Sequence, residues 1–410
     1  MNSIYLNWRR ITILMSFLIV LVFSNTFAQE IAPVVEANNK FAFELYSKYK
    51  SKDGNVFFSP YSISSALAMT YEGARGKTAE EMLAVFHFPK EATLCREGFL
   101  SINNQINKED KRYELKVANA LWAQKDSRFL EAYFKLIESY YGGGVTNLDF
   151  INDTENSRLT INNWVEEKTN KKIKNLIPQG IITTMTRLVL TNAIYFRGKW
   201  LMQFDEKNTV EGDFKVTPEN SVRVKMMKKT DKEAEFNYGE TDKLQILELP
   251  YDGQELSMLL LLPKNGDLKS VEQSLDSQTL TALKNKLQMQ WVNVFLPKFK
   301  FETKYFMADD LKEMGMPTAF SDMADFSGMT GNKDLFISQV IHQAFVEVNE
   351  EGTEAAAATA VIVEKCSVLP SRPKIFKADH PFIFIIQETK TGNILFIGRV
   401  SDPIKDESKS

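Results

Sequence analysis

The sequence is poor in the residue types that build catalytic and metal-binding sites. Its 410 residues include only three histidines and two cysteines. It also lacks the P-loop, GxGxxG, HExxH, CxxC and GxSxG motifs. A hydrolase built around His87, His342 or His380 is the weakest interpretation, because no local motif supports one. We therefore predict no metal, no cofactor and no enzymatic activity.

A strong excess of charge of one sign is also absent. The formal net charge is −3 and the sequence pI is about 5.9. A nucleic-acid partner would more often require a basic face, so we expect none. No repeat, low-complexity tract or Gly/Ser/Pro linker interrupts residues 29–410. The sequence therefore predicts a single domain over that range.

The apolar run at the N-terminus is short. It covers residues 11–23, whereas a transmembrane helix needs about 20 apolar residues. Arg9 and Arg10 precede it, and Thr26 and Ala28 supply small residues at the two positions that a signal peptidase reads. This pattern predicts a signal peptide over residues 1–28 that is cut near Ala28. We expect a secreted protein, extracellular or periplasmic, without stable membrane association; an uncleaved anchor is the alternative.

The two cysteines do not require a disulfide. Cys95 is expected on a helix, and Cys366 lies in a polar stretch near the C-terminus. A secreted chain of this length can bury a sufficient core without cross-links. Two free thiols are the favoured interpretation, with a Cys95–Cys366 bridge as the alternative.

Helical and strand patterns are segregated along the chain. Apolar spacing predicts helices over residues 38–49, 62–69, 78–86 and 159–173, with Thr78 and Glu81 forming a cap. Later apolar runs predict strands over residues 187–196, 245–250, 256–262, 292–297, 344–348, 382–387 and 394–399. The last two flank a turn at residues 388–393 that suits a hairpin. We expect an α+β fold with mostly antiparallel sheets.

Residues 349–367, NEEGTEAAAATAVIVEKCS, carry a conflict of propensities. Four consecutive alanines favour a helix, whereas the threonine, valine and isoleucine residues after them favour a strand. As a strand, residues 353–364 would place the odd-numbered side chains from Thr353 to Val363 on one uncharged face, while Glu354 and Glu364 would share the other face. A segment of this kind can adopt two conformations.

Four motifs in sequence order make residues 29–410 resemble a serpin, a member of the serine protease inhibitor family. They are NVFFSPYSIS at 55–64 with GARGKT at 73–78, LTNAIYFRGKW at 190–200, EEGTEAAAA at 350–358, and ADHPFIF at 378–384. The resemblance implies the serpin fold, with about eight to nine helices around three mostly antiparallel sheets. It also implies an exposed reactive-centre loop over residues 350–374.

The family's mechanism suggests how that loop would act. In an inhibitory serpin, a protease cuts the loop, and the part before the cut inserts into the central sheet and traps the covalent acyl-enzyme. The resemblance assigns the hinge of that movement to Glu350, Gly352, Thr353, Glu354, Ala355, Ala356, Ala357 and Ala358. Small residues there favour an inhibitor over a non-inhibitory carrier or chaperone, which is the alternative.

The resemblance also implies the cleaved bond and the partner. Counting fourteen positions from the hinge glycine gives Cys366–Ser367, with Lys365–Cys366 as the second choice. Cysteine suits elastase-like or subtilisin-like pockets, whereas Lys365 would suit a trypsin-like one. The expected partner is a serine protease held in a covalent acyl complex, with a cysteine protease as the alternative. We expect the inhibitor itself to be a monomer.

A second set of residues resembles the family's sheet-opening region. Ser59, Ser62, Asn192 and His342 match a polar cluster beneath the central sheet, and Trp200 matches a tryptophan at the end where insertion begins. Buried polar groups need partners, so loss of one member would destabilise the closed sheet by about 1–3 kcal/mol. These residues would also matter for folding in a non-inhibitory relative.

Overall fold

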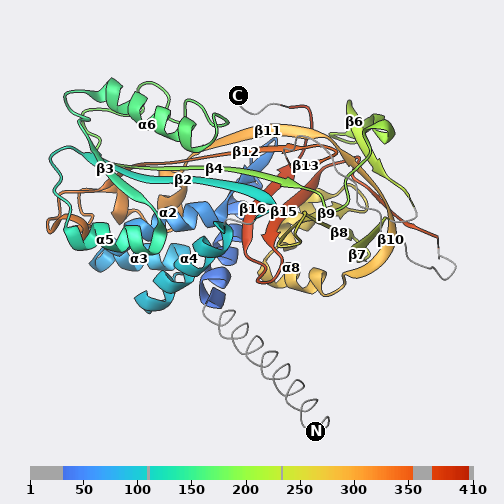
Figure 1. The fold of residues 1–410 in the computed structure, drawn as a ribbon, viewed down its shortest axis with the longest axis horizontal. Helices are drawn as coiled ribbons and strands as arrows, with labels where there is room; N and C mark the ends of the chain where they lie inside the picture. Colours follow the sequence, from blue (N-terminus) through green and yellow to red (C-terminus); the bar gives the residue numbers. More distant parts are fainter. Residues whose placement is uncertain (1–30, 109–110, 232–233, 354–371, 406–410) are drawn as a thin grey trace, which may run out of the picture.

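The computed structural model describes residues 31–108, 111–231, 234–353 and 372–405. Two β-sheets with helices packed around them form this part of the chain (Figure 1). The α+β expectation is therefore confirmed. Among the described residues, no helix is both long and apolar enough to span a membrane.

The six-stranded sheet contains the segment that the sequence marks as a hinge. Its order is β11 (Phe299–Phe306), β12 (Ile337–Val348), β13 (Gly352–Thr353), β4 (Leu188–Lys199), β2 (Tyr113–Gln124) and β3 (Gly144–Leu148). Strands β4 and β12 are parallel to each other, as are β2 and β3. The other neighbours are antiparallel.

The ten-stranded sheet consists of two parts that share β10. Its order is β1 (Val56–Phe58), β16 (Ile394–Val400), β15 (Phe382–Glu388), β9 (Leu256–Pro263), β8 (Leu244–Pro250), β7 (Glu235–Glu240), β10 (Gln288–Pro297), β6 (Ser221–Lys229) and β5 (Val210–Lys215). Strand β14 (Lys374–Lys377) runs parallel to β10. Counting the two parts separately gives the three mostly antiparallel sheets that were expected.

Ten α-helices occur in the described part of the chain, slightly more than the eight to nine expected. The first covers residues 31–49. The others are α2 (Pro60–Gly73), α3 (Gly76–Phe86), α4 (Ala92–Ile106), α5 (Glu131–Tyr141), α6 (Thr154–Lys168), α7 (Leu268–Ser274), α8 (Ser277–Lys284), α9 (Ala308–Met314) and α10 (Ser327–Thr330). Two 3-10 turns, η1 (Glu206–Asn208) and η2 (Thr318–Phe320), complete the set.

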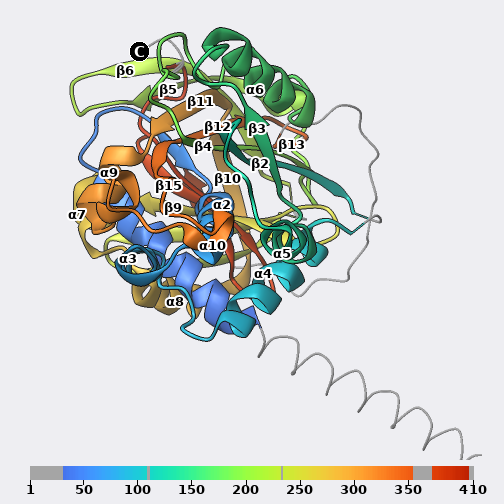
Figure 2. The ribbon, with the colours of Figure 1, turned by 90° about the vertical axis from the view of Figure 1, so that its left-hand side faces the viewer.

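The six-stranded sheet has a different cover on each face. Helix α6 lies over one face, while α2 lies on the other side of the sheet (Figure 1, Figure 2). Alternation along β4 matches this arrangement. Leu190 and Ile194 belong to the large core with α2, whereas Ala193 belongs to a smaller cluster with Ile161 and Val165 of α6.

Two details of the helix prediction are wrong. Thr78 does not cap α3; the helix begins at Gly76, and the Thr78 hydroxyl accepts a hydrogen bond from the Asp325 amide at 2.9 Å. Helix α6 does not reach residue 173, because Asn170 and Lys171 adopt positive φ angles of 51° and 62° that end it.

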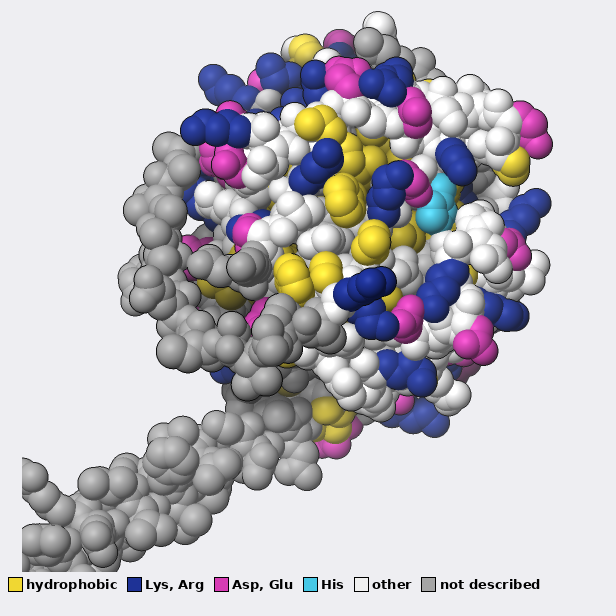
Figure 3. Space-filling view, turned by 90° about the vertical axis from the view of Figure 1, so that its right-hand side faces the viewer, with side chains coloured by type: hydrophobic (Ala, Val, Ile, Leu, Met, Phe, Trp, Pro, Cys, Tyr) yellow, Lys and Arg dark blue, Asp and Glu magenta, His cyan; other side chains and the backbone are white. Residues whose placement is uncertain are grey.

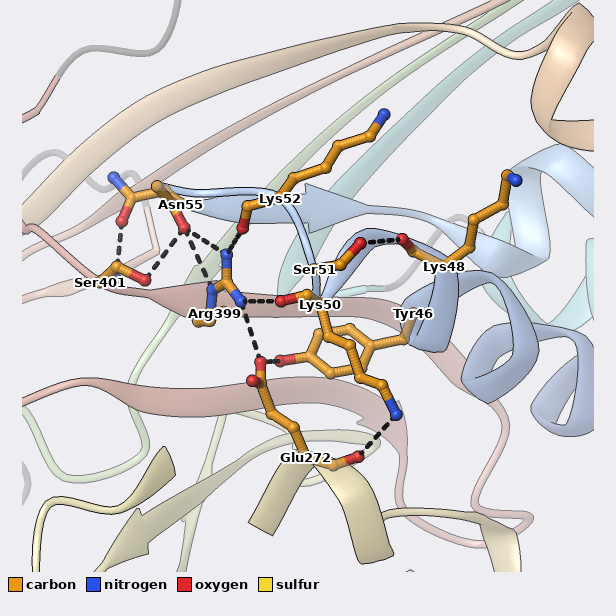
Figure 4. A network of polar contacts seen from close by, with 10 residues as sticks. Tyr46, Lys48, Lys50, Ser51, Lys52, Asn55, Glu272, Arg399 and Ser401 are labelled. Atoms are coloured by element: carbon orange, nitrogen blue, oxygen red, sulfur yellow. Dashed lines mark hydrogen bonds and ion pairs between the residues drawn. The ribbon is translucent and has the colours of Figure 1, made fainter. Parts of the chain in front are cut away.

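A buried arginine joins the first helix to the last strand (Figure 4). Arg399 on β16 donates hydrogen bonds to the carbonyls of Lys50 at 2.9 Å and Gly54 at 2.7 Å, and to Glu272 at 3.1 Å. Glu272 also accepts from the Tyr46 hydroxyl at 2.7 Å. These bonds fix the end of helix 31–49 against β16 and α7, far along the sequence.

Candidate functional site

The candidate site is the boundary between β4 and β12. The two strands pair directly, from Leu188 opposite Ile337 to Tyr195 opposite Phe345. At the end beyond Phe345, β13 lies between them and pairs antiparallel with both. The central sheet is therefore closed along most of this boundary and already split at one end.

Glycine is required at the first position of β13. A Cβ on Gly352 would lie 2.0 Å from the carbonyl oxygen of Gly198, a distance that no side chain tolerates. Thr353 follows and is buried, with its hydroxyl 2.7 Å from that of Tyr251. The side chain of Thr353 therefore faces the core, as the expected strand alternation requires.

Trp200 lies beside this entry point. Its indole Nε1–H donates to the Asn349 carbonyl at 3.0 Å, and its amide donates to the Glu351 carbonyl at 2.8 Å. The indole stacks on Tyr251, with ring centroids 4.7 Å apart. Trp200 thus holds the turn that leads into β13.

Glu350 anchors the same turn by charge. Its buried carboxylate accepts from Lys298 Nζ at 2.6 Å and from the Thr209 hydroxyl at 2.8 Å. Burial alone would raise the pKa of Glu350, but the hydrogen bonds from Lys298, the backbone and Thr209 outweigh it and hold this pKa below its usual value. The carboxylate therefore stays ionised at neutral pH.

The predicted polar cluster lies within the closed part of the boundary. His342 and Asn192 stand opposite each other on β12 and β4, and His342 Nδ1 is hydrogen-bonded to Asn192 Oδ1. His342 Nε2 accepts from the Ser59 amide at 3.1 Å, so Nδ1 carries the proton and donates to Asn192. All three residues are fully buried. The pair bridges the two strands that β13 separates further along.

Burial fixes the charge state of this histidine. Desolvation lowers the pKa of His342 to about 3, and the ring is stacked against Tyr305 with centroids 6.2 Å apart. His342 is therefore neutral at physiological pH, which its role as both donor and acceptor requires.

A third strand joins the cluster through a residue that the sequence did not single out. Asn119 on β2 lies opposite Asn192 and accepts from its amide. Ser62, also buried, accepts from Asn192 Nδ2 at 2.6 Å and donates to Asn119 Oδ1 at 3.2 Å. Tyr251 and Lys298 were likewise missed, because each acquires its role only through contacts distant in sequence.

Gln343, next to His342 on β12, has no such hydrogen bonds among the described residues. Gln343 is fully buried, and neither atom of its side-chain amide has a hydrogen-bond partner among the described residues. It lies opposite Ala193, on the face of the sheet covered by α6. An unpaired buried amide costs free energy, so this position raises the energy of the closed sheet.

Part of the predicted site lies outside the described residues. This applies to Glu354, Ala355, Ala356, Ala357 and Ala358 of the hinge, to the candidate bonds at Lys365, Cys366 and Ser367, and to the signal peptide. Cys95 is a buried free thiol on α4, and burial raises the pKa of that thiol to about 12. No group of histidine, cysteine or acidic residues in the described ranges could hold a metal ion.

Comparison with known proteins gives one consistent result. A family model described as Serpin (serine protease inhibitor) matches residues 36–403. An uncharacterized serpin-like protein of Methanosarcina acetivorans is 45% identical over 384 residues, covering 91% of this chain and 89% of its own length. The human leukocyte elastase inhibitor is 42% identical over 377 residues, covering 90% of this chain and 98% of its own.

A solved structure named for a different activity has the same fold. Human thyroxine-binding globulin superposes with a TM-score of 0.83 at 31% identity. The match covers 92% of this chain and all of that one. A protein named as an elastase inhibitor and one named as a thyroxine-binding globulin thus both resemble this chain, so the fold alone does not distinguish inhibition from ligand binding.

Proposed function

The chain belongs to the serpin family, and from that premise we propose that it inhibits serine proteases irreversibly as a suicide substrate. The observation that carries the proposal is β13. Gly352 and Thr353 already occupy the first two positions of a strand between β4 and β12. A cleaved loop would extend this strand without having to create an entry.

The register of β13 predicts which residues an extended strand would lie between. Thr353 lies opposite Gly198 on β4 and Val348 on β12, and each further loop residue moves one position back along both strands. Six steps place Thr359 between Asn192 and His342. The inserting strand would therefore separate the hydrogen-bonded pair that closes the sheet and present a hydroxyl in its place.

Side-chain size supports the same path. Residues that follow Thr353 on its face are Ala355, Ala357 and Thr359, and this face turns toward the large core. Small side chains enter a packed sheet without overfilling it. Each ladder hydrogen bond that an inserted residue forms stabilises the inserted strand by about 0.5–1.5 kcal/mol net. A charged or bulky residue at these positions would instead favour a carrier.

The chemistry is that of the protease. Its nucleophilic serine Oγ attacks the carbonyl carbon of the residue before the cut, and its histidine takes the serine proton and passes it to the leaving amine. The peptide bond breaks and an ester forms. Loop insertion then moves the attached protease before water can hydrolyse that ester. The inhibitor supplies no catalytic group.

We place the cut at Cys366–Ser367, with Lys365–Cys366 as the second choice, and assign an elastase-like or subtilisin-like protease as the target. The name of the human relative agrees with an elastase. A cysteine protease is the alternative target. We further propose that the protein acts as a monomer after export and removal of residues 1–28, with the extracellular space or the periplasm as its destination.

Denaturing gels and intact-mass analysis test this function. Residues 29–410 are mixed with leukocyte elastase, subtilisin or trypsin. We expect a complex that survives denaturant, together with a released fragment that begins at Ser367. The matched variant Thr353→Arg should be cut at the same bond without forming the complex, because a buried unpaired charge blocks insertion, while Thr353→Val should keep activity. Cleavage without a complex for the unmodified protein would contradict inhibition and favour a carrier.

A further inference from the structure

The turn between β9 and α7 contains a chemically labile pair of residues. Asn265 and Gly266 form the only Asn-Gly pair in the sequence, and both residues are exposed. Asparagine is one of the thermolabile residue types of proteins. A glycine after it leaves the intervening peptide nitrogen without a side chain to shield it. The Gly266 nitrogen can therefore reach the side-chain carbonyl carbon of Asn265.

Neither of these two groups is held by a hydrogen bond. The side-chain amide of Asn265 and the backbone N–H of Gly266 have no hydrogen-bond partner in the part of the chain that the structure describes. The carbonyl of Gly266 is bound, by the Leu268 amide at 3.0 Å. Apart from the chain neighbours, a Cβ on Gly266 would meet only His380 Cδ2, at 4.0 Å, so the space beside Gly266 is open.

The residue before the pair is fixed in place by charge and by its backbone. The Lys264 amide donates to the Lys243 carbonyl at 2.8 Å, and Lys264 Nζ pairs with Glu240 at 2.7 Å. Lys374 on β14, at the right-hand end of Figure 1, binds the same carboxylate at 2.8 Å. Figure 3 shows acidic and basic side chains interspersed over that end of the molecule. A new negative charge in the turn would therefore arise beside existing ion pairs.

The helix after the pair carries a buried carboxylate. Asp267 caps α7 by accepting from the Ser270 amide at 3.1 Å. Further along α7, Glu272 accepts from Arg399 at 3.1 Å in the network of Figure 4. A longer backbone between β9 and α7 would therefore act on the position of Glu272.

Other exposed asparagines with a small residue after them lack this freedom. Among the described residues, Asn156 and Asn220 are each followed by serine. Ser157 lies in α6, and its amide donates to the Asp153 carbonyl at 3.0 Å. Ser221 begins β6 and is paired with β5. Sequence and structure thus single out Asn265.

We propose that Asn265 is a site of spontaneous modification to aspartate and isoaspartate. Water takes the proton of the Gly266 N–H, and the nitrogen lone pair attacks Asn265 Cγ. A C–N bond forms, the Cγ–Nδ2 bond breaks, and ammonia leaves, which closes a succinimide ring. Water then opens this ring at Cγ to give aspartate, or at the backbone carbonyl carbon to give isoaspartate. Both products carry a new carboxylate, and isoaspartate lengthens the backbone by one atom.

This modification does not depend on inhibitory function, and ageing of the protein at neutral pH tests it. Peptide mapping should show a gain of about one dalton in the peptide that contains Asn265. An isoaspartyl methyltransferase should label the same peptide. Asn265→Gln should lose this label, because a glutamine side chain cannot close the same five-membered ring. The matched control Asn220→Gln should keep it. Both positions are exposed, so both variants should fold.

The chain unfolded in denaturant gives the reference for the native protein. Asn265 should react in both states. Reaction in the unfolded chain alone would show that the native turn protects Asn265 and would overturn the proposal, as would earlier modification of another asparagine or none at all. The aged unmodified protein should also melt at a lower temperature than aged Asn265→Gln protein. Equal midpoints after complete modification would overturn the link to α7.

Discussion

Gln343 offers a direct test of the energy held in the closed sheet. Its amide is buried without a partner among the described residues, and a buried unsatisfied polar group costs about 1–3 kcal/mol. Methionine has a similar length and no such requirement. We therefore expect Gln343→Met to raise the free energy of unfolding by about 1–3 kcal/mol. For a chain of this size, that corresponds to a midpoint about 1–4 °C higher.

Calorimetry of the uncleaved protein measures this shift. Gln278→Met on the exposed surface of α8 is the matched control and should change stability by less than about 0.5 kcal/mol. A more stable closed sheet should also open more slowly, so a larger share of the Gln343→Met protein should be hydrolysed by elastase as an ordinary substrate. An unchanged or lower midpoint would refute the reasoning, because it would mean that the amide is satisfied in the native protein.

Three further predictions concern the hinge and the cluster. Glu350→Ala should lower the free energy of unfolding by about 1–3 kcal/mol, because it removes the partly exposed ion pair with Lys298. The pKa of Glu350 lies below its ordinary 4.5, so the stability difference between the two proteins should be complete above pH 4.5 and should be lost as the pH falls through the lower folded-state pKa. Thermal melts over this pH range measure it. Asn192→Ala should lower stability by about 1–3 kcal/mol in denaturant titrations, and an unchanged transition would contradict the cluster's role. Gly352→Ala places a Cβ against the carbonyl of Gly198, so elastase should cut this variant while gels show less than half the normal complex; an undiminished yield would contradict the tight fit.

The sequence predicted those parts of the structure that depend on local patterns. The strands around residues 382–387 and 394–399 form the expected hairpin, and Asn192 and His342 meet as the motif resemblance implied. Strand β2 was missed because its face toward α6 mixes apolar and polar residues. Asn119 belongs to the cluster only because β2 and β4 pair in one particular register, and a register between distant strands cannot be obtained from one segment.

The network around Arg399 bears on the order in which the chain can fold. Arg399 and Gly54 are 345 residues apart, and Val56 on β1 pairs with Arg399 on β16. During synthesis, helix 31–49 and β1 emerge first, yet the strand that completes their packing emerges almost last. Contacts of such long range slow folding. The apolar surface of helix 31–49 and β1 therefore remains exposed to chaperones and to other chains until nearly the whole protein has been made.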